Sequence, residues 1–403
     1  MSAMPRLVVI GGGAIGSAAA CFLARDHGLA PLVLERDPSY RRASSALSAS
    51  SYRQQFSTAV NVALSRASLA FYRRIGDELA VQGERPDIGL VERGYLYLAS
   101  EAGATGLREL HAWQRGKGVD VALLDAAQLR QRFPWLAGEG LALGSLGQSG
   151  EGWFDGWSVL QAFRRKAAAC GARFVAAEAT ALEMRGARIA AVRCADGSRI
   201  EADGVLVAAG AWSAALLAPL GIDVPVRARK RDVFVFDAPL AEPGMPLVID
   251  PSGTWWRPEG AAATGAPAAT PRGRYLTGAP PRGDDADDIP LDAIDHGLFD
   301  AHIWPLLAAR VPAFEAVRRV QAWAGYYEMN TFDHNGLVGP WPGLDNLHLA
   351  CGFSGHGLQQ APAAARGVAH HIVHGRWHDE LDLAALEPSR IDRGAPVIER
   401  CVI

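Results

Sequence analysis

The stretch Leu7-Val-Val-Ile-Gly-Gly-Gly-Ala-Ile-Gly16 decides the fold of this chain. Its apolar, β-branched start over 7–10 is followed by a glycine-rich turn and a helix-like segment over 17–25, and a second apolar run over 31–34 ends in Glu35. This order of strand, turn, helix and acid-terminated strand is the setting that a GxGxxG dinucleotide motif requires. The sequence therefore predicts a Rossmann-type unit around this stretch.

Each glycine of the motif has a separate task. Gly11 permits the tight turn out of the strand, Gly13 lets backbone N–H groups approach a pyrophosphate, and Gly16 lets the helix pack close to the sheet. Glu35 follows Gly11 by 24 residues and is expected to accept hydrogen bonds from a ribose hydroxyl pair, which disfavours a 2′-phosphate. Both NAD and FAD satisfy this pattern, and a motif that opens the chain favours FAD.

The composition is that of an ordinary globular protein: 403 residues, 49% hydrophobic and 21% charged, enough for two or three domains. Forty basic residues against 43 acidic residues give a net charge of −3, which disfavours a nucleic-acid binder. We expect a cytoplasmic chain without a transmembrane segment, because no apolar stretch is long enough to span a bilayer and no signal-peptide pattern precedes residue 7. The five cysteines are odd in number and form no CxxC pair, so no disulfide framework is expected.

Hydrophobic periodicity separates helical from extended segments along the rest of the chain. Helices are expected over 60–82, 101–135, 157–171, 298–307 and 358–374. Strands are expected over 94–98, 173–175, 188–193, 205–208, 229–236, 253–257, 274–278 and 347–350. The turn Asp196-Gly197 is expected to join the strands at 188–193 and 205–208. Six glycines within 138–152 indicate a loop or turn-linked strands, and 261–273 has the low complexity of a hairpin loop.

Nucleotide-binding elements recur at the start, in the middle and near the end of the chain, separated by β-rich segments. We therefore predict a discontinuous nucleotide-binding domain made of residues 1–84, 155–224 and 325–403. The intervening residues, 85–154 and 225–324, are predicted to form a substrate-binding domain. The opening motif would then belong to a module assembled from three separate pieces of chain.

Two further segments make the motif specific. Val205-Leu-Val-Ala-Ala-Gly-Ala-Trp-Ser213 and Cys351-Gly-Phe-Ser-Gly-His-Gly357 follow it in the order found in one family. From residue 6 to about 375 the chain resembles the FAD-dependent oxidoreductases of the D-amino-acid oxidase and sarcosine oxidase family, which includes glycine oxidases. Within that family, four segments resemble a branch that includes a mitochondrial FAD-dependent assembly factor for respiratory complex I: 52–57, 151–155, 330–336 and 352–362.

This resemblance implies an α/β fold with a glutathione-reductase-like, Rossmann-type FAD-binding domain. It also implies an α+β substrate domain whose mostly antiparallel sheet covers the flavin ring. The helix that starts near residue 357 would direct its N-terminus at the pyrimidine end of the flavin, where reduction leaves negative charge. The residues implied to hold FAD are Gly11, Gly13, Ala14, Ile15, Gly16, Glu35, Arg36, Ser44, Ser45, Ala179, Ala209, Gly210, Trp212, Gly355, His356, Gly357, Leu358 and Gln359.

The sequence departs from its relatives at the positions that modify flavin chemistry. Tyr326 stands where sarcosine oxidases carry the cysteine bonded to flavin, and no histidine lies between residues 40 and 71 to make the other linkage known in the family. Non-covalent FAD is therefore expected. Leu276 stands where monomeric oxidases place a lysine that promotes the reaction of reduced flavin with oxygen. This favours a dehydrogenase, which would pass electrons to a protein or quinone acceptor.

The usual grip on a substrate carboxylate is also missing. Glu328 occupies the position of the arginine used by glycine and D-amino-acid oxidases, and Gln359 that of a lysine in sarcosine oxidases. Either Arg53 and Arg257 hold the carboxylate instead, or Glu328 receives a cationic amine. The substrate-binding candidates are Arg53, Gln55, Trp256, Arg257, Tyr326, Glu328 and Gln359, with Tyr327 as a further possible wall of the pocket.

The activity that this resemblance implies is oxidation of the C–N bond of an amino acid or N-substituted amino acid. Hydride would pass to flavin N5, and the imine product would be hydrolysed by water. His356, Arg53 and Glu328 are the candidate catalytic residues. Two alternatives stay open: oxidation of a 2-hydroxy acid, for which His356 would be the base, and a flavoprotein that acts by partner binding or assembly.

A histidine-rich segment near the end of the chain is not expected to bind metal. His370 and His374 have the helical i, i+4 spacing of a zinc pair, with His371 and His378 nearby. No acid follows in an HExxH pattern, and the helix continues from the flavin-binding turn. We interpret the segment as a solvated polar helix face, without a metal.

Overall fold

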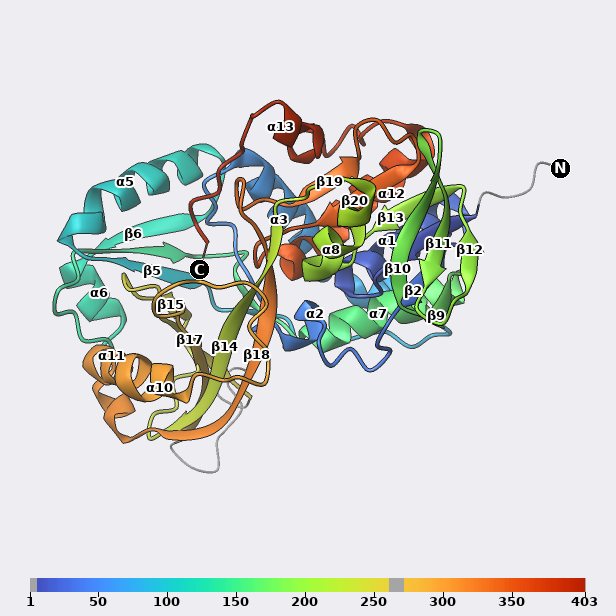
Figure 1. Cartoon of the computed structure of the whole chain (residues 1–403). Helices are drawn as coiled ribbons and strands as arrows, with labels where there is room; N and C mark the ends of the chain where they lie inside the picture. The colour runs from blue at the N-terminus through green and yellow to red at the C-terminus, as the bar shows by residue number, and fades with distance from the viewer. Residues whose placement is uncertain (1–5, 261–271, 403) are drawn as a thin grey trace.

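The computed structural model describes residues 6–260 and 272–402, and its core is organised around two large β-sheets (Figure 1). Most of the hairpin loop expected over 261–273 lies outside the described residues. None of the helices in the described ranges combines the length with the apolar character that a membrane span requires.

The first sheet is the predicted Rossmann-type unit, extended by four more strands. Its six strands lie in the order β19-β20-β13-β1-β2-β9, and all neighbours are parallel except β19 and β20. Their bounds are β1 Leu7–Ile10, β2 Leu32–Glu35, β9 Arg173–Ala176, β13 Gly204–Val207, β19 Leu337–Pro340 and β20 Leu347–Cys351. The prediction of an α/β, Rossmann-type domain is confirmed.

Alternation along β1 shows why both faces of this sheet are apolar. Leu7 and Val9 pack into a core with three helices, α1 (Ala14–His27), α7 (Gly156–Ala169) and α12 (Gly357–His374). Val8 and Ile10 pack on the other face against a small antiparallel sheet of β10 (Ala179–Arg185), β11 (Arg188–Cys194) and β12 (Arg199–Glu201). The turn at Asp196-Gly197 joins β11 to β12, and not to β13 as expected, because Cys194 and Ser198 close a hairpin there.

The second sheet has eight strands in the order β18-β14-β17-β16-β15-β5-β7-β6. All neighbours are antiparallel except β15 and β5. The bounds are β5 Tyr95–Ala99, β6 Val121–Asp125, β7 Leu143–Gly147, β14 Val226–Ala238, β15 Leu247–Ile249, β16 Trp255–Glu259, β17 Gly273–Gly278 and β18 Arg318–Asn330. The expected mostly antiparallel sheet is confirmed.

The two faces of the eight-stranded sheet have different surroundings. One face packs Phe234, Phe236 and Trp256 against α6 (Ala126–Arg132) and the helical segment 296–310 in a large core. The opposite face carries a smaller cluster of Val233, Val235 and Leu276, next to Trp255 and Trp323. In Figure 1 the long strands β14 and β18 of this sheet lie between the outer helices α10–α11 and the first sheet. The sheet therefore has an open face directed toward the parallel sheet.

The remaining elements connect these layers. A three-stranded sheet has the order β3-β8-β4. The further bounds are α2 Ser44–Leu47, β3 Ser51–Tyr52, α3 Ala59–Tyr72, α4 Ile75–Glu78, β4 Val91–Glu92, α5 Glu101–Gly116, β8 Gly152–Trp153, η1 Gly210–Trp212, α8 Ser213–Leu217, η2 Ala218–Leu220, α10 His296–Leu298, η3 Phe299–Ile303, α11 Trp304–Arg310, η4 Pro312–Ala316, η5 Ala384–Leu386 and α13 Ser389–Asp392.

Three helix predictions need correction. The segment 101–135 contains strand β6 between two helices, because Gly118 turns with a φ of +75° and Asp125 then caps α6 with a capping box. The helix expected over 60–82 is interrupted at residues 73–74. The helix expected over 298–307 runs through a π-helical stretch at Phe299–Ile303. The division into two discontinuous domains stays a prediction.

Candidate active site

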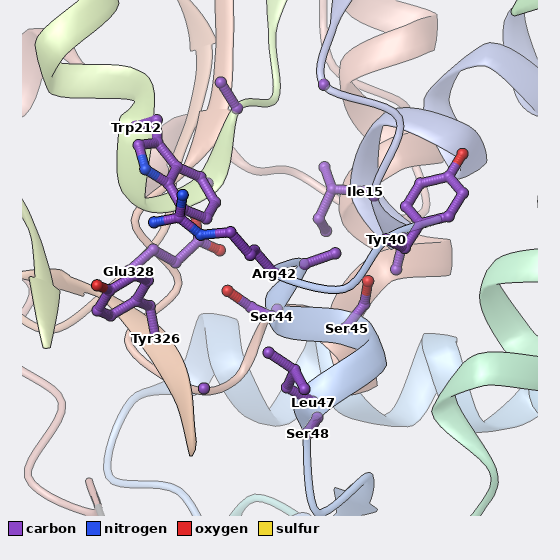
Figure 2. Close-up of a pocket in the computed structure, with 18 of the residues that line it drawn as sticks. Ile15, Tyr40, Arg42, Ser44, Ser45, Leu47, Ser48, Trp212, Tyr326 and Glu328 are labelled. Atoms are coloured by element: carbon purple, nitrogen blue, oxygen red, sulfur yellow. The ribbon is translucent and has the colours of Figure 1, made fainter. Parts of the chain in front are cut away.

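A cavity lies between the first sheet and the open face of the second (Figure 2). Its walls come from the carboxyl ends of β1, β2, β13 and β20, from α2, and from β14, β16 and β18. Eighteen of the residues predicted from the sequence line it: Gly11, Gly13, Ala14, Ile15, Glu35, Arg36, Ser44, Ser45, Ala179, Ala209, Gly210, Trp212, Tyr326, Tyr327, Glu328, Gly355, Gly357 and Leu358. The edge formed by the carboxyl ends of parallel strands is where open α/β sheets bind ligands.

The glycine-rich turn leaves room for a ligand on one side only. A Cβ on Gly11, whose φ is +96°, would lie 2.3 Å from the Ala208 carbonyl oxygen, and a Cβ on Gly16 would lie 1.9 Å from that of Gly11. Gly16 is therefore a packing glycine beneath the cavity. Gly13 faces open space, where the nearest atom to an added Cβ is Ser45 Oγ at 3.8 Å.

The groups around Gly13 fit an anionic diphosphate. Helix α1 begins just after Gly13 without a side-chain cap, so its first N–H groups point freely at the cavity. The buried Ser45 hydroxyl has no hydrogen-bond partner among the described residues. Ser44 and Ser45 lie together on α2 opposite Ile15, as Figure 2 shows. An uncapped helix N-terminus and an unsatisfied hydroxyl both need an acceptor, which phosphate oxygens provide.

The predicted ribose acid is held in place by backbone. The Glu35 carboxylate accepts hydrogen bonds from the N–H groups of Gly12 and Asp37, both at 2.8 Å, and lines the cavity. Beyond it, the Arg36 guanidinium lies 3.8 Å from the Trp212 ring centroid. Arg42, which the sequence analysis missed, extends toward the same indole at 5.6 Å (Figure 2). Two cations beside the Trp212 indole, which itself contacts Tyr326, suit a negatively charged cofactor.

Glu328 dominates the other end of the cavity. It lies on β18 and one carboxylate oxygen accepts the Gly352 N–H at 2.9 Å. Glycines on two loops make room for it, because a Cβ on Gly210 or Gly357 would come within 3.7 Å or 3.2 Å of its oxygens. Burial raises the pKa of Glu328 to about 7, against the opposing effect of backbone N–H groups. No described cation forms an ion pair with it.

The aromatic and apolar walls near Glu328 follow the sequence expectation in part. Tyr326 and Tyr327 both line the cavity, and the Tyr326 hydroxyl donates to the Ile289 carbonyl at 2.8 Å. Leu276 is buried beside Val233, which itself lines the cavity, so this wall is apolar where the resemblance points to a lysine in oxidases. The structure thus supplies no described cationic side chain at that position.

Arg53 and His356 lie outside the cavity, in a buried cluster behind it. The Arg53 guanidinium donates to the backbone carbonyls of Gln55 and Cys401 and lies 3.3 Å from the His356 ring nitrogen Nε2. Burial and the neighbouring guanidinium lower the pKa of His356 well below its ordinary range. Glu399 accepts hydrogen bonds from residues 57, 58 and 61 and completes the cluster. The donors of Arg53 are therefore occupied by the chain itself.

The two predicted glutamines support this cluster and do not contact the cavity. The Gln359 amide oxygen accepts the Arg53 backbone N–H at 2.8 Å, because one residue beyond Leu358 the helix turns its side chain toward α3. Gln55 donates to Glu151 at 2.9 Å and accepts from Ser145 at 2.8 Å. Both amides are satisfied inside the protein, so their expected contact with substrate is not seen.

The remaining two candidates are separated by the alternation of β16. Trp256 is fully buried in the outer core, and Trp255, its neighbour on the opposite face, lines the cavity instead. Arg257 is buried and donates to the carbonyls of Ala49 and Pro258 at 2.8 and 2.9 Å, with Glu259 as its ion pair. Its Nη groups are therefore paired within the chain, while its buried Nε has no hydrogen-bond partner among the described residues.

Several residues that line the cavity are not among those predicted from the sequence. They lie in loops or on strand faces that carry no motif: Tyr40, Arg42, Leu47, Ser48, Ala49, Ser51, Arg231, Asp232, Val233 and Trp255. Arg42 had one available signal, since it directly precedes the pair of serines predicted near the diphosphate. Side chains alternate between the two faces of a strand, so Trp255 and Trp256 are expected on opposite faces of the sheet. The alternation does not say which of the two faces the cavity.

Comparisons with known proteins agree with this geometry. Residues 6–371 match the DAO family, described as FAD dependent oxidoreductase. The chain is 40% identical to FAD-dependent oxidoreductase domain-containing protein 1 of Xenopus laevis, over 98% of this chain and 84% of that protein. The crystal structure of glycine oxidase from Geobacillus kaustophilus superposes with a TM-score of 0.77 and 25% identity, covering 95% of this chain and 98% of the other. L-proline dehydrogenase from P. horikoshii gives a TM-score of 0.81 at 23% identity, covering 98% and 100%.

The cofactor expectation is confirmed by family and geometry together. The diphosphate end of the cavity fits FAD, and no cysteine or histidine occurs among the described lining residues, so neither covalent linkage known in the family has a side chain available. FAD is held without a covalent bond. The chain belongs to the DAO family of FAD-dependent oxidoreductases.

Proposed function

We propose that this protein is an FAD-dependent dehydrogenase that oxidises the C–N bond of an amino acid or N-substituted amino acid. The observation that carries the proposal is the Glu328 carboxylate, which has no cationic partner among the described residues. It faces the cavity from β18, a strand of the eight-stranded sheet that bounds the cavity and is called the roof below. A buried carboxylate without a partner favours a cationic ligand. A substrate ammonium group supplies that charge.

The chemistry follows from the protonation state of Glu328. An amine loses hydride from its α-carbon readily only when its nitrogen is neutral, so the ammonium proton must leave first. A carboxylate whose pKa is about 7 is suited to accept this proton near neutral pH. Bound FAD supplies the acceptor for the hydride that leaves the substrate carbon. The resulting imine is hydrolysed by water to a carbonyl compound and an amine or ammonia.

The positions of the cations favour one of the two recognition modes expected from the sequence. Neither Arg53 nor Arg257 lines the cavity, and both donate to backbone carbonyls, which leaves recognition of the amine by Glu328 as the better supported mode. Arg231 lines this end of the cavity, where it pairs with Asp285 and leaves Nε without a partner. It is the cation that we propose for a substrate carboxylate.

Two finer points rest on neighbouring residues. His356, the base expected for oxidation of a 2-hydroxy acid, lies outside the cavity against Arg53. Glu328 is then the base available for either substrate class, and its lack of a cationic partner among the described residues favours the amine. Leu276 and its apolar surroundings favour a dehydrogenase with a protein or quinone acceptor over an oxidase. The names of the relatives agree with amine chemistry, since glycine oxidase and mitochondrial sarcosine dehydrogenase are among them.

Anaerobic reduction of the purified flavoprotein tests the proposal. Amino acids and N-methyl amino acids should bleach the flavin absorbance, and the rate should rise with pH through about 7 as Glu328 ionises. Glu328→Gln should reduce that rate roughly 100-fold, within the range that loss of a general base causes. Glu139→Gln, which changes an exposed glutamate, is the matched control.

Other outcomes assign other functions. Bleaching by 2-hydroxy acids alone would replace the amine proposal with the hydroxy-acid alternative. A flavin that no small reductant bleaches, in a protein that retains a stable partner on pull-down, would support assembly in place of catalysis. Rapid peroxide formation in air-saturated buffer would overturn the preference for a dehydrogenase.

A further inference from the structure

Four histidines gather where helices α1 and α12 end, far along both helices from the cavity. His27 is the last residue of α1, His370 and His374 lie one turn apart in the last turns of α12, and His378 follows that helix. His27 is distant in sequence from the other three. The fold brings it to them because α1 and α12 pack side by side against the parallel sheet.

Three of these side chains converge on one point. Ring nitrogens of His27, His370 and His374 all lie within 4.8 Å of one another. The ring centroids of His370 and His374 are 4.3 Å apart, and those of His27 and His374 are 5.2 Å apart. The ring of His378 lies 5.0 Å from that of His370. Three imidazoles with a fourth within reach form the ligand set of a tetrahedral site.

An independent observation points to a ligand at the centre of the cluster. The Nε2 atom of His370 is buried, and it has no hydrogen-bond partner among the described residues. Buried polar atoms are normally paired. An unpaired ring nitrogen among three imidazoles therefore needs a partner for its lone pair, either a metal ion or a hydrogen-bond donor. A cation at the point of convergence satisfies that nitrogen and the facing ones together.

The local charges keep the imidazoles in the form that binds metal. Burial and the neighbouring histidine side chains lower the pKa of both His27 and His370. Neutral imidazole is the ligand form, and it predominates at neutral pH when the pKa is lowered. The charged groups that face the cluster are Asp26, Arg366 and Arg376, and Asp26 is already paired with Arg25 at 2.6 Å.

We propose that His27, His370 and His374 bind one divalent transition-metal ion of the zinc class, with His378 as the fourth ligand. Imidazole ligands without carboxylates select zinc, copper or nickel over magnesium and calcium. A Zn–N distance of about 2.0 Å in a tetrahedron puts the nitrogens about 3.3 Å apart, so the rings need to close by about 1.5 Å. His374 is exposed and free to rotate, which makes that closure accessible.

The position of the site indicates its role. Helices α1 and α12 both direct their N-termini at the cofactor cavity and carry the histidines at their C-terminal ends. Fourteen residues of helix rise about 21 Å, so the metal would lie far from the reacting atoms. It would clamp together the two helices that hold the diphosphate and the flavin. The metal is therefore a structural ligand and not part of the redox chemistry.

The test uses the full-length holoprotein with any affinity tag removed. After treatment with a chelator, calorimetric titration with Zn²⁺ should show one ion bound per chain with a dissociation constant of about 1 μM or lower. His27→Gln and His374→Gln should each weaken binding at least tenfold, and His296→Gln, which removes an exposed histidine, should not. Co²⁺ should give the intense visible bands of tetrahedral coordination in the wild type and in His296→Gln, and not in His27→Gln or His374→Gln.

Thermal unfolding gives a readout that is independent of flavin activity. Zinc should raise the unfolding temperature of the wild type and of His296→Gln, and should leave that of His27→Gln unchanged. The proposal is overturned if the wild type binds no zinc, or if all three histidine variants bind it as the wild type does. Because the flavin spectrum reports folding of every variant, loss of zinc binding with normal flavin content cannot be attributed to misfolding.

Discussion

The two ends of the cofactor cavity differ in how they recognise a ligand. At the diphosphate end, recognition depends on the main chain: the turn at Gly11 and Gly13, the uncapped start of α1 and the backbone-held Glu35. At the flavin end it depends on side chains such as Glu328 and Trp255, supported by roof strands and loops. The first end therefore suits the diphosphate of any dinucleotide, and the second end is where we propose that the substrate is selected.

The difference shows in which predictions the structure places at the cavity. The spacing of glycines fixes backbone conformation, so residues chosen from the motif lie where they were expected. Arg53, Gln55, Arg257 and Gln359 are substrate-binding candidates from the sequence, and each of them binds another part of the chain. The orientation of a side chain at the flavin end therefore depends on its hydrogen-bond and ion-pair partners, which the spacing of residues in the sequence does not encode.

The largest effect should come from the main-chain end. Gly16→Ala places a methyl group 1.9 Å from the Gly11 carbonyl oxygen, so the turn and α1 must separate and the diphosphate site opens. We expect loss of nearly all bound FAD, measured as flavin per chain after gel filtration. Gly106→Ala makes the same change on an exposed face of α5, where an added Cβ meets no atom, and should retain full flavin content. Equal flavin content in both variants would contradict this account of the turn.

A pair of tryptophans separates packing from ligand contact at the flavin end. Trp256→Ala empties a fully buried site in the outer core and should destabilise the protein by roughly 3–5 kcal/mol in chemical denaturation. Trp255→Ala should cost less stability but alter the flavin absorbance and the apparent substrate affinity, since its indole lines the cavity. If the ligand effects followed Trp256 instead, the assignment of the two faces of β16 would be reversed.

A smaller effect is expected from the acid that supports the cluster behind the cavity. Burial opposes ionisation of Glu399, but Arg53 and hydrogen bonds from Ser57 and Asn61 outweigh it and hold its pKa well below the ordinary value of 4.5. A lowered carboxyl pKa contributes stability that is complete above about pH 4.5 and is lost as the pH falls below it. Glu399→Gln should therefore lower stability by about 2 kcal/mol at pH 7, and the deficit should shrink in acid.

This variant also sharpens the comparison between the two ends. Glu399 lies outside the diphosphate site, so its loss should leave flavin content unchanged while the stability falls. Glu315→Gln changes an exposed glutamate and should leave both the stability and the flavin content unchanged. A deficit that stays constant from pH 7 to pH 3 would show that the carboxylate charge is not what stabilises the cluster.

The limits of the sequence prediction have identifiable physical causes. The parallel sheet was predictable because its strands are continuous apolar runs between glycine turns. Strand β6 was not, since its short run Val121-Ala-Leu-Leu-Asp125 is compatible with either structure and becomes a strand by pairing with β7. His27 gave no signal at all as a partner of His370, because only tertiary packing brings the ends of α1 and α12 together.

The long antiparallel pair β14 and β18 constrains how a ligand enters and leaves. Each strand has 13 residues, a length of about 44 Å, and the pairing runs from Val226 opposite Asn330 to Asp237 opposite Arg318. One end of the pair contacts the cofactor loops through Glu328, and the other reaches the outer core. A ribbon hydrogen-bonded over that whole length is too stiff to swing open as a lid. We therefore expect this pair to stay fixed while substrate and product exchange.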